Sequence, residues 1–351
     1  MKSPSLLALL VPMLLLSCGD ASSTAAEGSA TEASATDHLY PSDVLPFLDK
    51  WKILNGDGSR SDELIGYEAP GFFYAVRDSA QGSSGTPWVV YKTPNAGVTS
   101  RTSSNTRTEL GEIRRWTPEE GGRLTGTLKV MHVSTSGDAR VAASHSVVVG
   151  QMHSMDGHEN EPLKIFYKKF PGHELGSVFW NYEINTAGED NGGRWDYSTP
   201  VWGHDMFVLG ETPDAAPAEP TDGVALGEEF SYAVDVREGL MTLTFERAGE
   251  APKTFTKSLV QSEYTRPSDI PDQIRTYYAA IGRDGVERPE AYAGERQFFK
   301  QGAYNQTNGK SPEDNIVWST GAETYDGDIE RQYANGDYAE VWFREGSLVS
   351  Y

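Results

Sequence analysis

The sequence predicts an all-β fold, and both its composition and its strand-like patterning support this. The chain has 351 residues, of which 36 are Gly, 17 are Tyr and 8 are Trp. Turn-forming glycines and aromatic residues, in a chain with few long apolar helical patterns, are typical of short strands joined by turns. Because no change of composition after residue 40 marks a second domain, we expect one β-sandwich with long loops.

Strand-like segments recur along the chain, and several of them alternate apolar and polar residues. The predicted strands span residues 123–133, 141–151, 163–170, 177–184, 206–209, 230–236, 240–245, 298–304 and 338–343. Two helices are expected, at residues 41–48 and 267–274. Segments rich in Gly, Pro and Asp, at residues 185–195, 212–223 and 307–314, are predicted to be surface loops.

The first residues predict an export signal. Lys2 supplies a positive start, and the apolar run at residues 6–16 is too short to span a membrane. The run ends at Cys18 and resembles a bacterial lipobox, in which the chain is cut before a cysteine that carries diacylglycerol. We therefore expect residues 1–18 to be a lipoprotein signal peptide with lipidation at Cys18. An ordinary secretory signal is the alternative.

Residues 19–39 are predicted to form a flexible tether, because they are rich in Ala, Ser, Thr and Glu and have no hydrophobic period. The folded domain then spans residues 40–351. Cys18 is the only cysteine, so an intrachain disulfide is impossible and the domain is expected to be stable through its core. Gly19, by resemblance to bacterial lipoproteins, favours the outer membrane or cell surface of a Gram-negative bacterium. Secretion is the alternative.

The formal net charge of −21 argues against nucleic acid as a partner, because phosphate binding needs a basic face. An acidic polysaccharide is still compatible with this charge. A few Arg and Lys in a groove outweigh carboxylates farther away than the Debye length of about 8 Å. We expect a monomer that meets the membrane only through its lipid anchor.

Two segments place a pair of polar residues on one face of a strand. Gln151 and His153 lie two residues apart at the end of an apolar run, and Arg107 and Glu109 have the same spacing. Each pair therefore points to one side of a sheet. Taken alone, a single histidine is more often structural, and an arginine beside a glutamate is usually a surface ion pair worth little.

A third segment, residues 298–306, alternates in the same way. Lys300, Gly302, Tyr304 and Gln306 share one face of the predicted strand. A glycine between a lysine and a tyrosine suits a groove in which a bulky ligand approaches the backbone closely. The alternative is a strand whose polar side simply meets water.

Together the three segments resemble the signatures of polysaccharide lyase family 7, the alginate lyases. Those signatures run Arg-Thr/Ser-Glu-Leu-Arg, Gln-Ile/Val-His and Tyr-Phe-Lys-Ala-Gly-Val-Tyr-Asn-Gln. All three occur here in the family's order, as Arg107-Thr108-Glu109-Leu110, Gln151-Met152-His153 and Phe298 to Gln306. Gly111 stands where the first signature commonly ends in arginine, so that cationic contact is either absent or supplied by Arg114 or Arg115. Met152 stands where the family has Ile or Val, a residue that tends to follow the preference for guluronate-containing or mannuronate-rich blocks. The block preference of this chain therefore stays open.

The resemblance implies a β-jelly roll, a concanavalin-like sandwich of two antiparallel sheets, that cleaves alginate by β-elimination with no metal and no cofactor. Arg107 and Gln151 would hold the sugar carboxylate beside the carbon that loses its proton. Tyr304 would act as acid, and also as base for mannuronate, whereas His153 would add a donor or act as base for guluronate. The substrate-binding residues implied are Lys300, Gln306 and Glu109.

Other functions stay open at this point. The substrate could be another polyuronate such as glucuronan, or the jelly roll could bind carbohydrate without catalysis. A jelly-roll glycoside hydrolase needs paired carboxylates, and residues 326–330 lack the required spacing. The folded region has extra length between residues 153 and 206, around 211–225 and between 306 and 338, and long loops there would favour exolytic action if they close one end of the groove.

Overall fold

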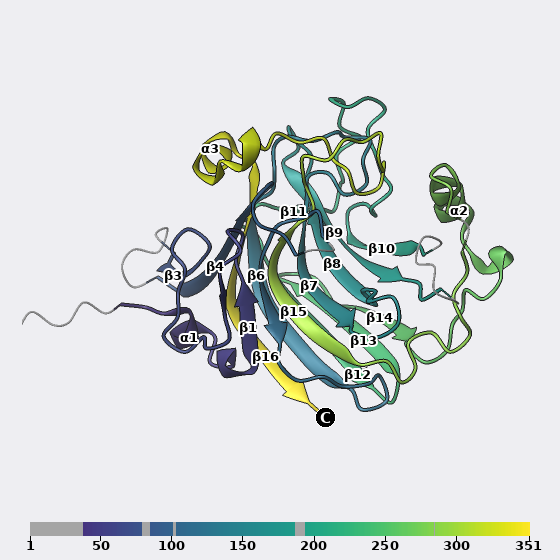
Figure 1. Ribbon diagram of the computed structural model, residues 1–351, viewed down its shortest axis with the longest axis horizontal. Coiled ribbons are helices and arrows are strands. Elements are labelled where there is room, and N and C mark those ends of the chain that lie inside the picture. Colours follow the sequence, from purple (N-terminus) through teal and green to yellow (C-terminus); the bar gives the residue numbers. More distant parts are fainter. Residues whose placement is uncertain (1–37, 79–84, 101–102, 187–193, 284) are drawn as a thin grey trace, which may run out of the picture. The chain divides into compact units, whose positions relative to one another are not determined.

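Strands from all parts of the folded region assemble into two sheets in the computed structural model (Figure 1). The structure describes residues 38–78, 85–100, 103–186, 194–283 and 285–351. Residues Leu39–Tyr351 form one compact unit, which is the part treated below. Cys18 and most of the expected tether lie outside the described residues.

Sheet A carries the three signature segments. Its strand order is β10-β9-β8-β7-β15-β5-β1-β2, and β11 pairs with β9. The strands of sheet A are β1 (Trp51–Leu54), β2 (Arg60–Ser61), β5 (Arg107–Glu112), β7 (Ser146–Ser154), β8 (Leu163–Lys168), β9 (Leu175–Glu183), β10 (Asp196–Trp202), β11 (Val224–Ala225) and β15 (Gln297–Asn305).

Sheet B packs behind it and has the order β14-β13-β12-β6-β16-β4-β3. Its strands are β3 (Phe73–Arg77), β4 (Pro87–Pro94), β6 (Gly122–His132), β12 (Glu229–Arg237), β13 (Leu240–Arg247), β14 (Lys253–Ser258) and β16 (Tyr338–Ser350). The strand pairs of both sheets are antiparallel. The expected all-β sandwich is confirmed.

The core lies between the sheets and follows from alternation along each strand. In β12 every second residue is buried, and Tyr232 is one of these. Its hydroxyl lies 2.8 Å from the amide nitrogen of Gln301 on β15, so a polar bond crosses the core. Gly150 on β7 makes room for it, since a Cβ there would lie 2.6 Å from the Tyr232 oxygen. Burying each large apolar side chain in such a core stabilises the fold by about 1.5–3 kcal/mol.

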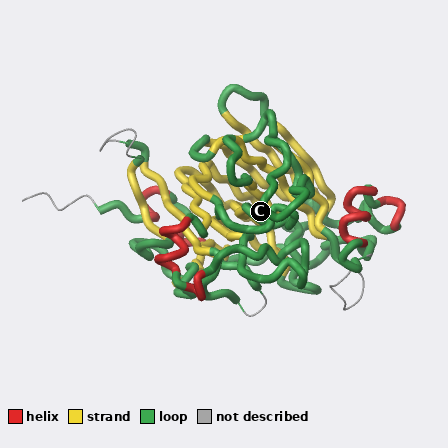
Figure 2. The backbone as a smooth tube through the Cα atoms, turned by 90° about the horizontal axis from the view of Figure 1, so that it is seen from above, coloured by secondary structure: helices red, strands yellow, loops and turns green. Residues whose placement is uncertain are grey.

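Helices are short and lie at the periphery of the strands (Figure 2). The helix expected at 41–48 is reduced to α1 (Pro41–Val44) and a 3-10 turn at Leu48–Lys50. The second helix begins later than expected, as α2 (Asp272–Ala279) after a 3-10 turn at Pro267–Asp269. No helix in the described ranges is long and apolar enough to cross a membrane.

Two parts of the sequence prediction are wrong. Residues 206–209 form no strand, because the backbone N–H groups of Met206 and Phe207 are bound by side chains, Ser198 Oγ at 3.0 Å and Asp205 Oδ1 at 2.8 Å. A third helix, α3 (Ile329–Asn335), was not expected. The Asp328 side chain caps its start, and Gly336 ends it with a φ of 84°.

Gly302 has a structural role, whereas the sequence predicted that it leaves room for a bulky ligand. Its φ is +147°, a conformation that favours glycine, and the pairing of β15 with β7 shifts register between Gln301 and Tyr304. A Cβ at Gly302 would lie 2.6 Å from the carbonyl oxygen of Thr108 on β5. The glycine therefore allows close packing of β15 on β5, which sets the direction of Tyr304.

Candidate active site

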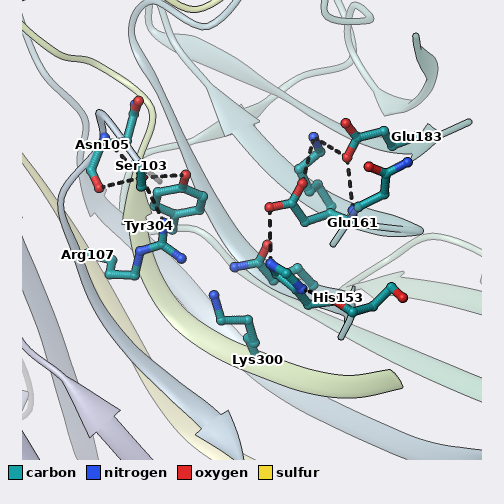
Figure 3. Close-up of polar contacts among 12 residues, drawn as sticks. Ser103, Asn105, Arg107, His153, Glu161, Glu183, Lys300 and Tyr304 are labelled. Carbon is teal, nitrogen blue, oxygen red and sulfur yellow. Dashed lines mark hydrogen bonds and ion pairs between the residues drawn. The ribbon is translucent and has the colours of Figure 1, made fainter. Parts of the chain in front are cut away.

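Three neighbouring strands of sheet A bring the predicted side chains together. β15 lies between β5 and β7, with Tyr304 opposite Arg107 and Lys300 opposite Gln151. His153 lies opposite Phe298 on the next outward position of β7. Alternation along the strands places these side chains on the face of sheet A that points away from the core (Figure 3).

Glu109 lies beneath this cluster and is only 3% exposed. Its carboxylate accepts hydrogen bonds from Lys300 Nζ at 2.8 Å, from Arg107 Nη1 at 3.4 Å, and from the amide nitrogen of Gln151. Burial acts to raise the pKa of Glu109, but Lys300 and Arg107 together lower it below its usual value. Glu109 is therefore an ionised anchor for three side chains, and two of these, Arg107 and Lys300, line the groove beside it.

Tyr304 lies between charged and polar neighbours. The guanidinium carbon of Arg107 is 3.7 Å from the centre of the Tyr304 ring, and Lys300 Nζ is 5.9 Å from it. Such cation–π contacts are attractive and are stronger where water is excluded. Burial acts to lower the pKa of Arg107, but Tyr304 and Glu109 raise it above its usual value. The guanidinium is thus a permanent positive charge on the face of the phenol.

His153 is held as a neutral ring. Its Nδ1 lies 2.5 Å from the carbonyl oxygen of Ser154, so Nδ1 carries the proton and Nε2 keeps its lone pair. Burial and the charge of Lys300 lower the pKa of His153 to about 3. Nε2 lies 3.6 Å from a carboxylate oxygen of Glu161. His153 is therefore neutral as expected, but it is a weaker base than a histidine of ordinary pKa.

Two pockets meet at Arg107 and His153, and together they form a groove along sheet A. The first, which we call the cationic pocket, has a volume of about 570 Å³. Its charged lining residues are Lys52, Arg60, Asp62, Arg107, Glu109, Arg115 and Lys300. Both pockets fall in the range of roughly 300–1,000 Å³ that is typical of small-molecule sites.

The second, which we call the mixed-charge pocket, has a volume of about 500 Å³ and includes Tyr304 in its lining. It is lined by Gln306 and Trp318, and its charged lining residues other than Arg107 are Glu159, Glu161, Lys164, Glu183 and Arg194. Here carboxylates and cations, Arg107 included, are equal in number, whereas cations outnumber carboxylates in the cationic pocket. The groove therefore changes its charge along its length.

Lys164 on β8 organises the floor of the mixed-charge pocket. It is 5% exposed, and its Nζ lies 3.1 Å from Asp196, 3.5 Å from Glu183 and 3.8 Å from Glu161. Burial opposes its charge, but the three carboxylates raise the pKa of Lys164 well above its usual value. Sequence patterns did not point to this cluster. The available signal was the pairing of Lys164 with Gln151, which needs the register of β7 and β8.

Two arginines close to Gly111 in the chain could supply the charge of the missing signature arginine. Gly111 lies opposite Lys300, and a Cβ there would have no atom closer than 3.9 Å. Arg115 reaches the cationic pocket and its guanidinium carbon lies 4.0 Å from the Phe298 ring centre. Arg114 instead donates to the carbonyl oxygen of Tyr351. Of the two expected candidates, Arg115 is the one that adds charge to the groove.

The jelly roll and its groove, together with the following matches, define a polysaccharide lyase. Residues 46–349 match the family model described as alginate lyase. The chain therefore belongs to the alginate lyase family, and the resemblance of the three signature segments is confirmed.

Solved and curated relatives agree with this assignment. The crystal structure of the exolytic PL7 alginate lyase AlyA5 from Zobellia galactanivorans is 66% identical, with a TM-score of 0.86, covering 89% of this chain and 98% of that one. An alginate lyase from Klebsiella pneumoniae is 27% identical over 259 residues, which are 65% of this chain and 71% of the relative. The crystal structure of the alginate lyase from Klebsiella pneumoniae, at 22% identity and a TM-score of 0.60 over 89% of this chain and 99% of that one, shares the fold.

Proposed function

We propose that this protein shortens alginate from a chain end by β-elimination and releases small unsaturated products. The observation that carries this proposal is the convergence of Arg107, Gln151, His153 and Tyr304 on one face of sheet A. A cation, an amide, a neutral imidazole and a phenol are the groups that such an elimination needs. Arg107 and His153 line both pockets and Tyr304 lines the mixed-charge pocket, so a bound chain would cross these three residues.

The first difficulty of the reaction is the low acidity of the proton on C5. The sugar carboxylate next to C5 resists a second negative charge, so it has to be neutralised in the transition state. Arg107 supplies a permanent positive charge, and Gln151 has a second amide proton besides the one that it gives to Glu109. These two residues would bind the carboxylate, with Lys300 adding charge nearby.

The proton transfer would then pass through Tyr304. As phenolate it removes the proton from C5, the C–H electron pair forms the C4–C5 double bond, and the C4–O4 bond breaks. The leaving O4 takes a proton from Tyr304 where both groups lie on the same side of the sugar, as in mannuronate. His153, neutral and facing the groove, would donate to or accept from the substrate, and it is the second base that guluronate requires.

The charge pattern of the groove supports attack at a chain end. Each alginate unit carries a carboxylate, so the cationic pocket suits the body of the polymer. In the mixed-charge pocket, Glu161 and Glu183 oppose a further carboxylate but can accept hydrogen bonds from sugar hydroxyls. Trp318 offers an aromatic face for one terminal sugar. The relative from Zobellia galactanivorans, at 66% identity, is described as exolytic.

The test is a comparison of the purified domain on separate polymannuronate, polyguluronate and polyglucuronate. We expect absorbance from unsaturated product on one or both alginate polymers, and chromatography of the earliest samples should contain only small products. A broad early ladder of oligomers would contradict attack at the chain end. Activity confined to polyglucuronate would contradict alginate as the substrate.

A further inference from the structure

Ser103 lies where the two central side chains of the proposed mechanism meet. Its Oγ is 3.2 Å from the phenol oxygen of Tyr304 and 3.0 Å from Nη2 of Arg107 (Figure 3). Ser103 belongs to the loop between β4 and β5 and lies outside the three signature segments. Sequence patterns therefore gave no reason to single it out.

The number of hydrogen bonds at Ser103 fixes the direction of its bond to Tyr304. A serine hydroxyl accepts through two lone pairs and donates one proton. Both lone pairs face groups that can only donate, the backbone N–H of Asn105 at 3.2 Å and Nη2 of Arg107 at 3.0 Å. The proton remains, and its two acceptors are the Tyr304 oxygen and the carbonyl oxygen of Asn105 at 3.1 Å. Towards Tyr304 the Ser103 hydroxyl can therefore act only as a donor, with its proton shared between Tyr304 and the carbonyl oxygen of Asn105.

We propose that Ser103 is a positioning residue that donates a hydrogen bond to the phenol oxygen of Tyr304 and thereby favours the phenolate that removes the C5 proton. The inference rests on the proposed function, in which Tyr304 is the base. A donor aimed at an anionic oxygen stabilises the charged form over the neutral one. Because Ser103 has no lone pair left for it, the Tyr304 proton is also free to turn towards the leaving O4.

Other charged or titratable groups surround Tyr304. The charged or titratable groups near it are Arg107, Glu109, His153, Glu161 and Lys300. Most of these are assigned to the substrate or to each other, so changing them alters binding as well. The Ser103 hydroxyl carries no charge, and Arg107 keeps its ion pair with Glu109 without it. Removing this hydroxyl therefore changes no charge, although it removes the contacts with Arg107 and Asn105 together with the one to Tyr304.

The experiment measures kcat and KM on polymannuronate across pH for the wild type and Ser103→Ala. A hydrogen bond to a charged group is worth enough to move a pKa by about one to two units. We expect the rising limb of the kcat profile to move up by about one to two pH units. At a pH below the limb, kcat should fall about ten- to hundredfold, and at high pH it should recover.

Three further variants control the result. Ser103→Thr keeps the hydroxyl and should keep the limb near its wild-type position, whereas Ser103→Cys, a weak donor, should move it in the same direction as alanine. Exposed Ser104→Ala removes a hydroxyl from the same loop and should leave the limb in place. Circular dichroism and thermal unfolding report whether each variant folds, and Ser103→Cys stands in if the alanine variant does not.

A limb at the wild-type position in Ser103→Ala, or a loss of kcat that is equal at every pH, overturns the proposal. A limb that also moves in Ser103→Thr overturns it as well. Failure of the proposed function is seen separately, because Tyr304→Phe would then still form unsaturated product. An inactive Tyr304→Phe with an unmoved Ser103→Ala limb rejects the role of Ser103 alone.

Discussion

Lys300 Nζ and the buried Glu109 carboxylate lie 2.8 Å apart, on adjacent strands of sheet A. The carboxylate also accepts hydrogen bonds from Arg107 and Gln151, so one anion holds two cations that line the groove and the amide of Gln151. We expect Glu109→Gln to reduce kcat/KM by about 100-fold or more, because the two cations lose their shared partner. Steady-state kinetics test this, with exposed Glu63→Gln as the control. Activity within a few-fold of wild type would contradict the anchoring role.

Tyr304→Phe removes the phenol oxygen and keeps the ring that lies against Arg107. We expect formation of unsaturated product to stop while the thermal unfolding midpoint changes by only a few degrees, because the hydroxyl is the proposed acid and base. The assay follows product absorbance over long incubation. Retained turnover would remove Tyr304 from the mechanism.

His153 should make the stability of the domain depend on pH. Burial and Lys300 lower its pKa to about 3 in the folded state, against an unfolded value near 6.5. On acidification the unfolded chain takes up this proton first, so the contribution is present above about pH 6.5 and is lost towards pH 3. The thermal midpoint should therefore fall less steeply over this window in His153→Gln than in wild type. His204→Gln is the control, and parallel curves for wild type and His153→Gln would contradict the shift.

Lys164 balances three carboxylates at the floor of the mixed-charge pocket. Lys164→Met keeps most of the length of the side chain without its charge and leaves those carboxylates without their common cation. Breaking a buried ion pair costs about 3–5 kcal/mol, and we expect a loss of this size in the free energy of unfolding. Denaturant titration measures it, with exposed Lys310→Met as the control. An unchanged midpoint would show that Arg194 alone balances the cluster.

Cys18 lies outside the described residues, and its lipidation stays a prediction from sequence. We expect the full-length chain expressed in a Gram-negative host to sediment with membranes, and Cys18→Ser to remain unprocessed or to appear in the soluble fraction. Immunoblots of separated fractions test this. Equal release of both proteins into the soluble fraction would indicate an ordinary secretory signal.

Alternation along single strands was enough to predict that Arg107, Gln151, His153 and Tyr304 belong to outward faces, and the family signatures grouped them. It could not predict Ser103, which reaches Tyr304 from a loop about 200 residues away in sequence. Such contacts depend on how loops fold over the sheet.

Strand register was a second limit. Lys164 was inside a predicted strand, but its position beside Gln151 depends on the pairing of β7 with β8, which alternation does not give. The strand expected at 206–209 failed for a third reason, because side chains of Ser198 and Asp205 bind its backbone N–H groups. Local sequence patterns therefore predicted which side chains share a strand face. The pairing of strands and the hydrogen bonds from side chains to the backbone could be seen only in the structure.

The groove joins strand-borne and loop-borne residues, and this division has a consequence for engineering. Arg107, Gln151 and Tyr304 are fixed by paired strands, whereas Glu161 and Trp318 belong to the connections after β7 and β15. Suppose that those connections are replaced by the ones from a relative that releases products of a different length. The size of the released sugar should then change, while the rate of bond breaking is preserved. The paired strands would then determine the elimination reaction, and the two connections would determine the length of the product.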